Sequence, residues 1–152
     1  DDLSVKLVYG AQTADEYDQV CRLIENHNLG DTVHLVGAVP HERLPLYYNA
    51  ADIAVFPSRV EGFGIVTIEA MACETPVVVT TAHLDGGHIE PGENAVLATA
   101  GDPPDLASSI ERLLDDPELR SRIASNGRRQ VERRYTTERL RNIFADIYPS
   151  LS

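Results

Sequence analysis

Residues 53–80, IAVFPSRVEGFGIVTIEAMACETPVVVT, decide the fold of this 152-residue chain. Apolar runs at residues 53–56 and 76–80 predict two strands, and the pattern between them fits a helix over about residues 64–73. Two strands joined through a helix form a parallel βαβ unit. Both runs are continuously apolar, which is typical of strands covered by helices on both faces. This segment therefore predicts an α/β fold with a parallel sheet.

The alternation of strands and helices continues on both sides of this segment. Further strands are expected at residues 5–9, 32–36 and 95–98, with helices at residues 14–28 and 42–49. After the last strand the chain is expected to be helical to its end, with apolar stripes at residues 106–114 and 140–147. Asp116 and Pro117 predict the N-cap and first turn of a helix between these stripes, and a break is expected near residues 135–137.

Composition narrows the class of protein. The chain has 13 basic and 24 acidic residues, a formal charge of -11, which argues against a broad nucleic-acid-binding surface. Its apolar runs are far shorter than the roughly 20 residues that span a bilayer, and no secretory leader is recognisable. Cys21 and Cys73 lack metal-site spacing and are expected to be reduced, half-buried thiols. We expect a soluble, cytoplasmic protein, at most peripheral to the inner face of a membrane.

The loop between the strand at 53–56 and the following helix carries the chemistry. Gly62 and Gly64 free the backbone just before the helix, whose unpaired amides and positive dipole end suit a phosphate group. Glu61 lies in the loop and Glu69 lies eight positions later, on the helix. Carboxylates accept hydrogen bonds from hydroxyl groups, so a sugar and a ribose are natural partners. The pattern predicts a phosphate-binding turn flanked by two hydroxyl acceptors.

Residues 57–72, PSRVEGFGIVTIEAMA, resemble the donor-binding signature of retaining nucleotide-sugar glycosyltransferases of the GT-B fold. Similarity to the C-terminal half of that family continues, in the same order, at residues 33–39, 44–52, 76–79, 92–95 and 106–117. The resemblance covers essentially the whole chain. It implies a Rossmann-like three-layer parallel sheet with extra C-terminal helices, and a single nucleotide-sugar-binding domain over residues 1–152.

This resemblance also implies roles for individual residues. Glu61, the catalytic candidate, would hold hydroxyls of the transferred sugar, and Glu69 would hold the ribose hydroxyls. Val39, in the segment Gly37-Ala38-Val39, resembles a contact to the base. The residues that would line the diphosphate and sugar, largely through backbone amides, are Gly62, Phe63, Gly64, Ile65 and Val66.

The implied reaction transfers a sugar from a nucleoside diphosphate with retention at the anomeric carbon, and needs no metal ion or other cofactor. The partners implied are a nucleotide-sugar donor and an acceptor glycan, lipid or small molecule bound by an N-terminal domain. The family's first strand and helix, which carry a basic pair facing the diphosphate, have no counterpart here, so we expect a fragment that is inactive alone. Residues 136–152 are expected either to form a crossover helix, which supports self-association when exposed, or to fold back.

The chain departs from the family at two glycine positions, now Glu74 and Ala95. Glycine after a helix permits a left-handed cap, so either Glu74 adopts that conformation or the helix ends differently.

Simpler interpretations and other functions stay open beside this one. Glu61 and Glu69 could each be ordinary solvated acids, Phe63 a packing residue, and His83 and His88 are expected at a loop surface. The arginine pairs 128–129 and 133–134 favour a solvated, ion-paired helix face. Alternative functions are a noncatalytic nucleotide-sugar-binding or assembly module and, more distantly, a nucleotide-sugar 2-epimerase.

Overall fold

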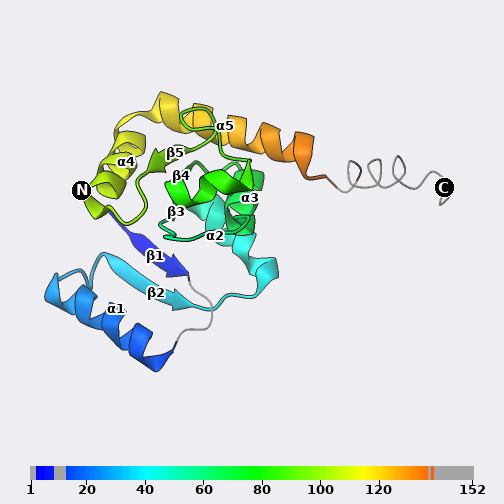
Figure 1. Cartoon of the computed structure of the whole chain (residues 1–152). Helices are drawn as coiled ribbons and strands as arrows, with labels where there is room; N and C mark the ends of the chain where they lie inside the picture. Colours follow the sequence, from blue (N-terminus) through cyan, green and yellow to red (C-terminus); the bar gives the residue numbers. More distant parts are fainter. Residues whose placement is uncertain (1–2, 9–12, 137, 139–152) are drawn as a thin grey trace. The chain divides into compact units, whose positions relative to one another are not determined.

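The computed structural model describes residues 3–8, 13–136 and 138, in two compact units, Asp1–Leu44 and Pro45–Ser152 (Figure 1). The first unit contains β1 (Val5–Val8), α1 (Ala14–Asn26), β2 (Val33–Gly37) and a 3-10 turn (His41–Arg43). β1 and β2 pair in parallel. Each predicted element of this unit is present, with bounds that differ from the expected ones by at most a few residues.

A capping box sets the start of α1. The Thr13 hydroxyl accepts a hydrogen bond from the Glu16 amide (3.3 Å), and the Glu16 carboxylate accepts one from the Thr13 amide (2.9 Å). Those bonds hold the pKa of the Glu16 carboxyl below its usual value. The helix therefore begins where two of its otherwise unpaired amides find acceptors.

The second unit carries a three-stranded parallel sheet. Its strands run in the order β3 (Ala54–Phe56), β4 (Val77–Thr80), β5 (Val96–Ala98), with Ala54 opposite Val77 and Val78 opposite Val96. The helices of this unit are α2 (Leu44–Ala50), α3 (Ile65–Ala72), α4 (Pro103–Asp115) and α5 (Pro117–Arg134), and a 3-10 segment, Thr81–Gly86, follows β4. The predicted α/β fold with parallel strands is confirmed.

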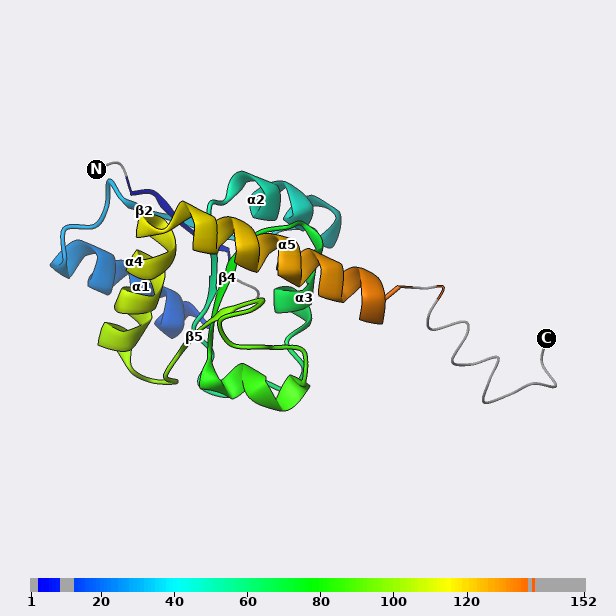
Figure 2. The same ribbon diagram turned by 90° about the horizontal axis from the view of Figure 1, so that it is seen from above.

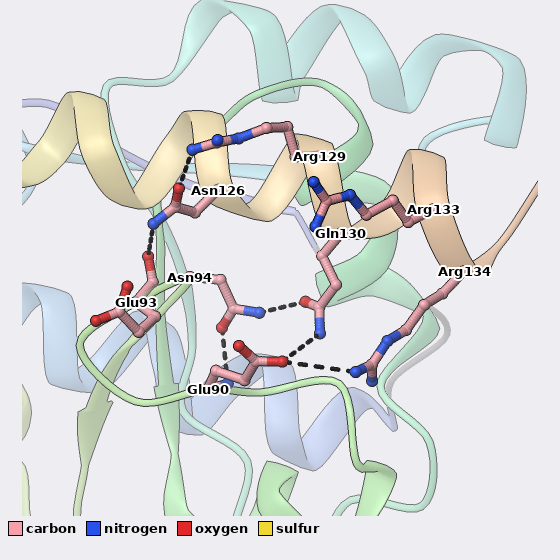
Figure 3. A pocket seen from close by; sticks show the side chains of 8 residues that line it. All are labelled: Glu90, Glu93, Asn94, Asn126, Arg129, Gln130, Arg133 and Arg134. Atoms are coloured by element: carbon pink, nitrogen blue, oxygen red, sulfur yellow. Dashed lines mark hydrogen bonds and ion pairs between the residues drawn. The ribbon is translucent and has the colours of Figure 1, made fainter.

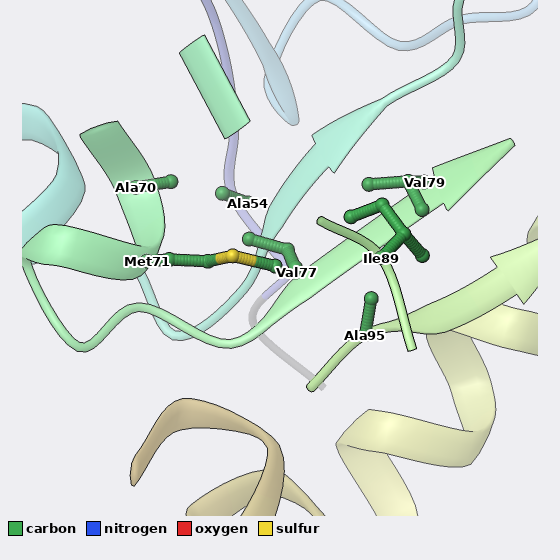
Figure 4. Packing of buried hydrophobic residues seen from close by; sticks show 7 residues of the cluster. All are labelled: Ala54, Ala70, Met71, Val77, Val79, Ile89 and Ala95. Atoms are coloured by element: carbon green, nitrogen blue, oxygen red, sulfur yellow. The ribbon is translucent and has the colours of Figure 1, made fainter. Parts of the chain in front are cut away.

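The middle strand β4 divides the core in two. All four of its residues are buried, and successive side chains point to opposite faces. Val77 and Val79 pack with Ala70 and Met71 of α3 in one cluster (Figure 4). Val78 packs on the other side, in a cluster whose other buried members are Val96, Leu113, Leu119 and Ile123. This strand therefore has the two covered faces that its uninterrupted apolar sequence predicts.

The same expectation is wrong for β1. Three of its four residues are exposed, and no described residue of the first unit is fully buried. Within that unit β1 pairs with one strand, β2, and α1 contributes no buried side chain. An apolar run predicts a strand because of its β-branched residues, but its coverage depends on what packs against it.

Glu74 resolves the first of the two departures from the family. Its φ is 58°, in the left-handed region. The Glu74 amide donates to the Met71 carbonyl (2.9 Å), and the Thr75 amide donates to the Ala70 carbonyl (3.1 Å). This is the Schellman arrangement that usually places glycine at this position. The helix thus ends as it would with glycine, and Glu74 carries the conformational cost.

The helix α5 covers α3 (Figure 2). It begins where predicted, with the Asp116 carboxylate accepting from the Leu119 amide (2.8 Å), and it ends before Tyr135, at the predicted break. The Arg128 guanidinium donates to the Ala72 carbonyl at the negative end of α3. The expected helix at residues 140–147 lies outside the described residues. In the part of the chain that is described, no helix is long and apolar enough to cross a membrane.

Candidate functional site

The turn between β3 and α3 is organised around Glu61. Its Oε1 accepts hydrogen bonds from the amides of Gly62 (3.0 Å) and Gly64 (3.2 Å), and its Oε2 accepts one from the Ser58 hydroxyl (3.4 Å). The Glu61 side chain is 24% exposed. The loop thus holds a fixed carboxylate that remains accessible on one side, which is the geometry of an acceptor for ligand hydroxyls.

Gly64 is the residue at which this turn joins α3. Its φ of 76° is left-handed, and a Cβ atom there would lie 3.2 Å from the His88 ring. Both the conformation and the space therefore demand glycine. The first amides of α3, at Ile65 and Val66, have no partner within the helix, and both residues are exposed. The positive end of the helix therefore favours an anion at this position.

Glu69 lies one turn into α3 and is half-buried. The Tyr48 hydroxyl, from α2, donates to its Oε2 (3.4 Å). Burial, followed by the charge of Glu69, raises the pKa of Tyr48 to about 12, so this hydroxyl stays protonated at neutral pH. No sequence pattern links Tyr48 with Glu69, which lies 21 positions away. Glu69 is therefore oriented by a neighbour, unlike an ordinary surface acid.

The expectation that His83 and His88 lie at a loop surface is wrong. Each is 1% exposed. The His83 ring lies 6.4 Å from the Phe56 ring and the His88 ring 5.6 Å from the Phe63 ring, measured between centroids. A Cβ atom at Gly86 would lie 2.7 Å from the His88 ring. The glycines that suggested an open loop instead make room for a buried ring.

Unsatisfied polar atoms gather at this site. Among the described residues, the buried side-chain nitrogen and oxygen atoms without a hydrogen-bond partner are Thr67 Oγ1, His83 Nε2 and both ring nitrogens of His88. Thr67 is in the first turns of α3, and both histidines contact Gly64 closely enough to crowd an added Cβ. Buried polar groups are paired in nearly all native structures, so such a group of exceptions marks this region for function.

The predicted site residues fall in both units. Glu61, Gly62, Phe63, Gly64, Ile65, Val66 and Glu69 are together in the second unit, on the turn and the first part of α3. Val39 is in the first unit, half-buried and two residues beyond β2. The contact of Val39 with a base stays a prediction.

A polar hollow away from this turn lies between the loop at residues 90–94 and α5, with a volume of about 350 Å³ (Figure 3). Its lining residues are Glu90, Glu93, Asn94, Asn126, Arg129, Gln130, Arg133 and Arg134. The Glu90 carboxylate accepts from Gln130 (3.2 Å) and lies 3.6 Å from the Arg134 guanidinium. The Arg129 guanidinium donates to the Asn126 side chain. These contacts agree with the predicted ion-paired face.

Metal-ligating and nucleophilic groups are sparse. Within residues 3–8, 13–136 and 138, no cluster of three or more His, Cys, Asp or Glu side chains is placed to hold a metal ion. Cys21 and Cys73 are free, half-buried thiols, as expected. Burial, outweighing the nearby Arg128 charge, raises the pKa of Cys73, which keeps this thiol protonated and unreactive.

Comparison with known proteins identifies the architecture. The model of the family described as "Glycosyl transferases group 1" matches residues 5–130. Alpha-D-kanosaminyltransferase from Streptomyces kanamyceticus is 34% identical over 127 residues, 84% of this chain and 33% of that protein. Sucrose-phosphate synthase from Thermosynechococcus elongatus superimposes with a TM-score of 0.85 at 35% identity, covering 96% of this chain and 38% of the other.

A further similar structure is Anabaena Alr3699/HepE in complex with UDP-glucose. It has a TM-score of 0.86 at 27% identity and covers 97% of this chain and 41% of the other. The chain thus spans about a quarter to two fifths of the length of the curated relatives that it matches.

Proposed function

Because this chain belongs to the group 1 glycosyl transferases, with the GT-B domain architecture, we propose that it is the donor-binding domain of a retaining glycosyltransferase. It would bind a nucleoside-diphosphate sugar, whose glycosyl group passes to an acceptor held elsewhere in the longer protein. The observation that carries this proposal is the turn in which the Glu61 carboxylate faces the open amino end of α3.

In this proposal the diphosphate, the sugar and the ribose of the donor would each meet a group on the turn or on α3. The diphosphate would lie at the amides of Ile65 and Val66, where the helix end favours negative charge. The sugar hydroxyls would donate to Glu61, and the ribose hydroxyls would donate to the Glu69 carboxylate, which also accepts from Tyr48. In this arrangement the domain stabilises the departing diphosphate by hydrogen bonds and dipoles rather than by a metal ion.

UDP is the donor nucleotide that we propose. The support is the similarity to HepE structures whose complexes contain UDP and UDP-glucose, at 29% and 27% identity. No contact among the described residues identifies the sugar or the acceptor.

Exposed apolar side chains around the turn support a larger assembly. Val60, Phe63, Ile65 and Val66 are all large, apolar and exposed. Contiguous exposed apolar groups mark interaction surfaces, so a second domain that closes over the donor would cover them.

Calorimetric titration of the folded chain with UDP, GDP and ADP tests this function directly. Saturable binding of UDP that is weakened in Glu69→Ala is the expected result, because each lost ribose hydrogen bond contributes about 0.5–3 kcal/mol. Glu111→Ala, an exposed acid on α4, is the matched control and should leave the affinity unchanged. A Glu69→Ala variant that binds UDP as tightly as the parent chain would contradict the ribose assignment.

The role of Glu61 is tested by comparing UDP with UDP-glucose. Glu61→Ala should weaken UDP-glucose and leave UDP nearly unaffected, because only the intact donor presents sugar hydroxyls to this carboxylate. Equal losses for both ligands would show that Glu61 shapes the turn without contacting the sugar.

A further inference from the structure

A buried histidine faces the Glu61 carboxylate from the side opposite its amide partners. His83 Nε2 lies 3.7 Å from Glu61 Oε2, too far for a hydrogen bond but close enough for an ion pair. The His83 side chain is wholly inaccessible to solvent. The other carboxylate oxygen, Oε1, accepts from Gly62 and Gly64. Glu61 therefore has the amides of its own turn at Oε1, and the Ser58 hydroxyl and the His83 ring at Oε2.

The hydrogen bonds around His83 assign its tautomer. The Thr80 hydroxyl donates its proton to the Ser58 carbonyl (2.5 Å). The same hydroxyl oxygen is 3.5 Å from His83 Nδ1. Because its hydrogen points to the Ser58 carbonyl, the oxygen acts toward the ring as an acceptor of a hydrogen bond from Nδ1–H. In the neutral ring, Nε2 then carries a lone pair that faces a carboxylate oxygen. Two acceptors face each other, and one additional proton would turn this contact into a charge-assisted hydrogen bond.

In the free protein at neutral pH, the surroundings of His83 favour the neutral form of its ring. Burial lowers the pKa of His83, and a charge on His88 would lower it further, whereas Glu61 and the Thr80 backbone raise it. Glu61 and His88 are the titratable groups that act on the ring among the described residues. Any movement of the Glu61 carboxylate toward Nε2 would favour protonation, because the Coulomb attraction grows as the distance falls.

A donor hydroxyl that uses the Gly64 amide as well as Glu61 would require such a movement. The amides of Gly62 and Gly64 are occupied by Glu61 itself in this structure. A sugar hydroxyl that donates to Glu61 and accepts from the Gly64 amide would have to enter between them. The carboxylate would then give up that amide bond, and of its other side-chain neighbours, Ser58 and His83, the histidine is the one that can offer a positive charge in return.

We propose that His83 is a positioning residue for Glu61: protonation of Nε2 draws the carboxylate toward the imidazolium and releases the amides of Gly62 and Gly64 to the donor. This inference rests on the donor-binding function proposed above. No bond to the sugar is made or broken in this step, and one proton is taken up from solvent. His83 acts only through Glu61, so it contacts no reacting atom.

The first test needs no ligand. In a pH titration followed by NMR, the amide signals of Gly62 and Gly64 should shift at the same pH as the His83 ring nitrogens. The shift of these amides should be absent in His83→Gln, and His34→Gln, a change at an exposed histidine of β2, should leave it unchanged. Amides that do not follow the His83 ring, or that titrate unchanged in His83→Gln, would overturn the proposal.

Glu61→Gln keeps the test decisive if His83→Gln does not fold. This variant alters a partly exposed side chain, and it should lower the pKa of His83 by removing the charge that raises it. The glycine amide shift coupled to His83 should disappear in this variant as well. An unchanged His83 titration in folded Glu61→Gln would contradict the pairing.

The second test links the pair to the donor. From pH 8 to pH 6, the affinity for UDP-glucose, which has no terminal phosphate that titrates in this range, should rise by at most tenfold per pH unit, the limit for uptake of one proton. In His83→Gln this rise should be absent. A UDP-glucose affinity in the parent chain that does not rise would overturn the link to donor binding. If a folded chain binds neither UDP nor UDP-glucose, the link to donor binding is overturned and the result counts against the donor function. The amide titration would still decide whether His83 positions Glu61.

Discussion

The two units of this chain are built from similar strand and helix sequences but differ in what they bury. The second unit has a fully buried strand, β4, between two apolar clusters. The first unit pairs two strands and buries no described residue completely. The apolar content of a segment therefore does not by itself show how much of that segment is buried. Because burial supplies the dominant favourable term in folding, we expect most of the intrinsic stability to reside in the second unit.

The largest effect that tests this difference comes from deleting core atoms. Ile123 of α5 is 0% exposed, whereas Leu23 of α1 is 57% exposed. Ile123→Ala should destabilise the second unit by about 2–5 kcal/mol, because it removes buried methyl groups and leaves a cavity. Leu23→Ala should change the stability by less than about 0.5 kcal/mol. Hydrogen exchange of the β4 amides measures both, and equal losses would contradict the assignment of the core to the second unit.

A smaller effect is expected where a backbone has no room for a side chain. A Cβ atom at Gly86 would lie 2.7 Å from the His88 ring and 2.9 Å from the Phe63 carbonyl oxygen, while one at Gly30 would meet nothing within 4 Å. Gly86→Ala should therefore cost about 1–3 kcal/mol through overpacking.

Gly30→Ala, in the first unit, is the matched control and should be close to neutral. Urea unfolding of the two variants compares the sites. If Gly86→Ala leaves the free energy of unfolding unchanged, the buried His88 ring has space to move. The inference of close packing beneath the turn would then be wrong.

Local patterns predicted the secondary structure well, because each element has its own start or stop signal. Asp116 and Pro117 mark the start of α5, and the glycine pair before α3 marks the turn. The same local pattern placed Glu61 on that turn and Glu69 on the helix, and family resemblance suggested their roles. The burial of His83 and His88 was missed, since a glycine-rich segment is equally compatible with an exposed loop and with a backbone that folds over a ring. Long-range packing of this kind leaves no periodic signal.

A stabilising change is expected at the left-handed cap of α3. Glu74 has a φ of 58°, a conformation that costs residues with a side chain about 1–2 kcal/mol. Glu74→Gly should stabilise the second unit by about 0.5–1 kcal/mol, after the entropy that glycine adds to the unfolded chain is subtracted.

Asn28 in the first unit has a φ of 55° and provides the comparison. Asparagine tolerates this region, so Asn28→Gly should give a smaller gain or none. Thermal unfolding of both variants is the measurement. A loss of stability in Glu74→Gly would show that the Glu74 side chain contributes contacts that outweigh its backbone strain.

The smallest effect is a pH dependence that separates a buried histidine from an exposed one. Burial lowers the pKa of His83 in the folded state, so below the unfolded pKa of about 6.5 the unfolded chain binds this proton more readily. The stability that depends on neutral His83 is complete above that pH and is lost as the pH falls toward the folded pKa. Between pH 7.5 and 5.5, the parent chain should therefore lose more stability than His83→Gln. His34 in the first unit is exposed, and His34→Gln is the matched control that should lose as much stability as the parent. If His83→Gln and the parent show the same slope, the acid sensitivity lies with other groups, and folding does not shift the pKa of His83.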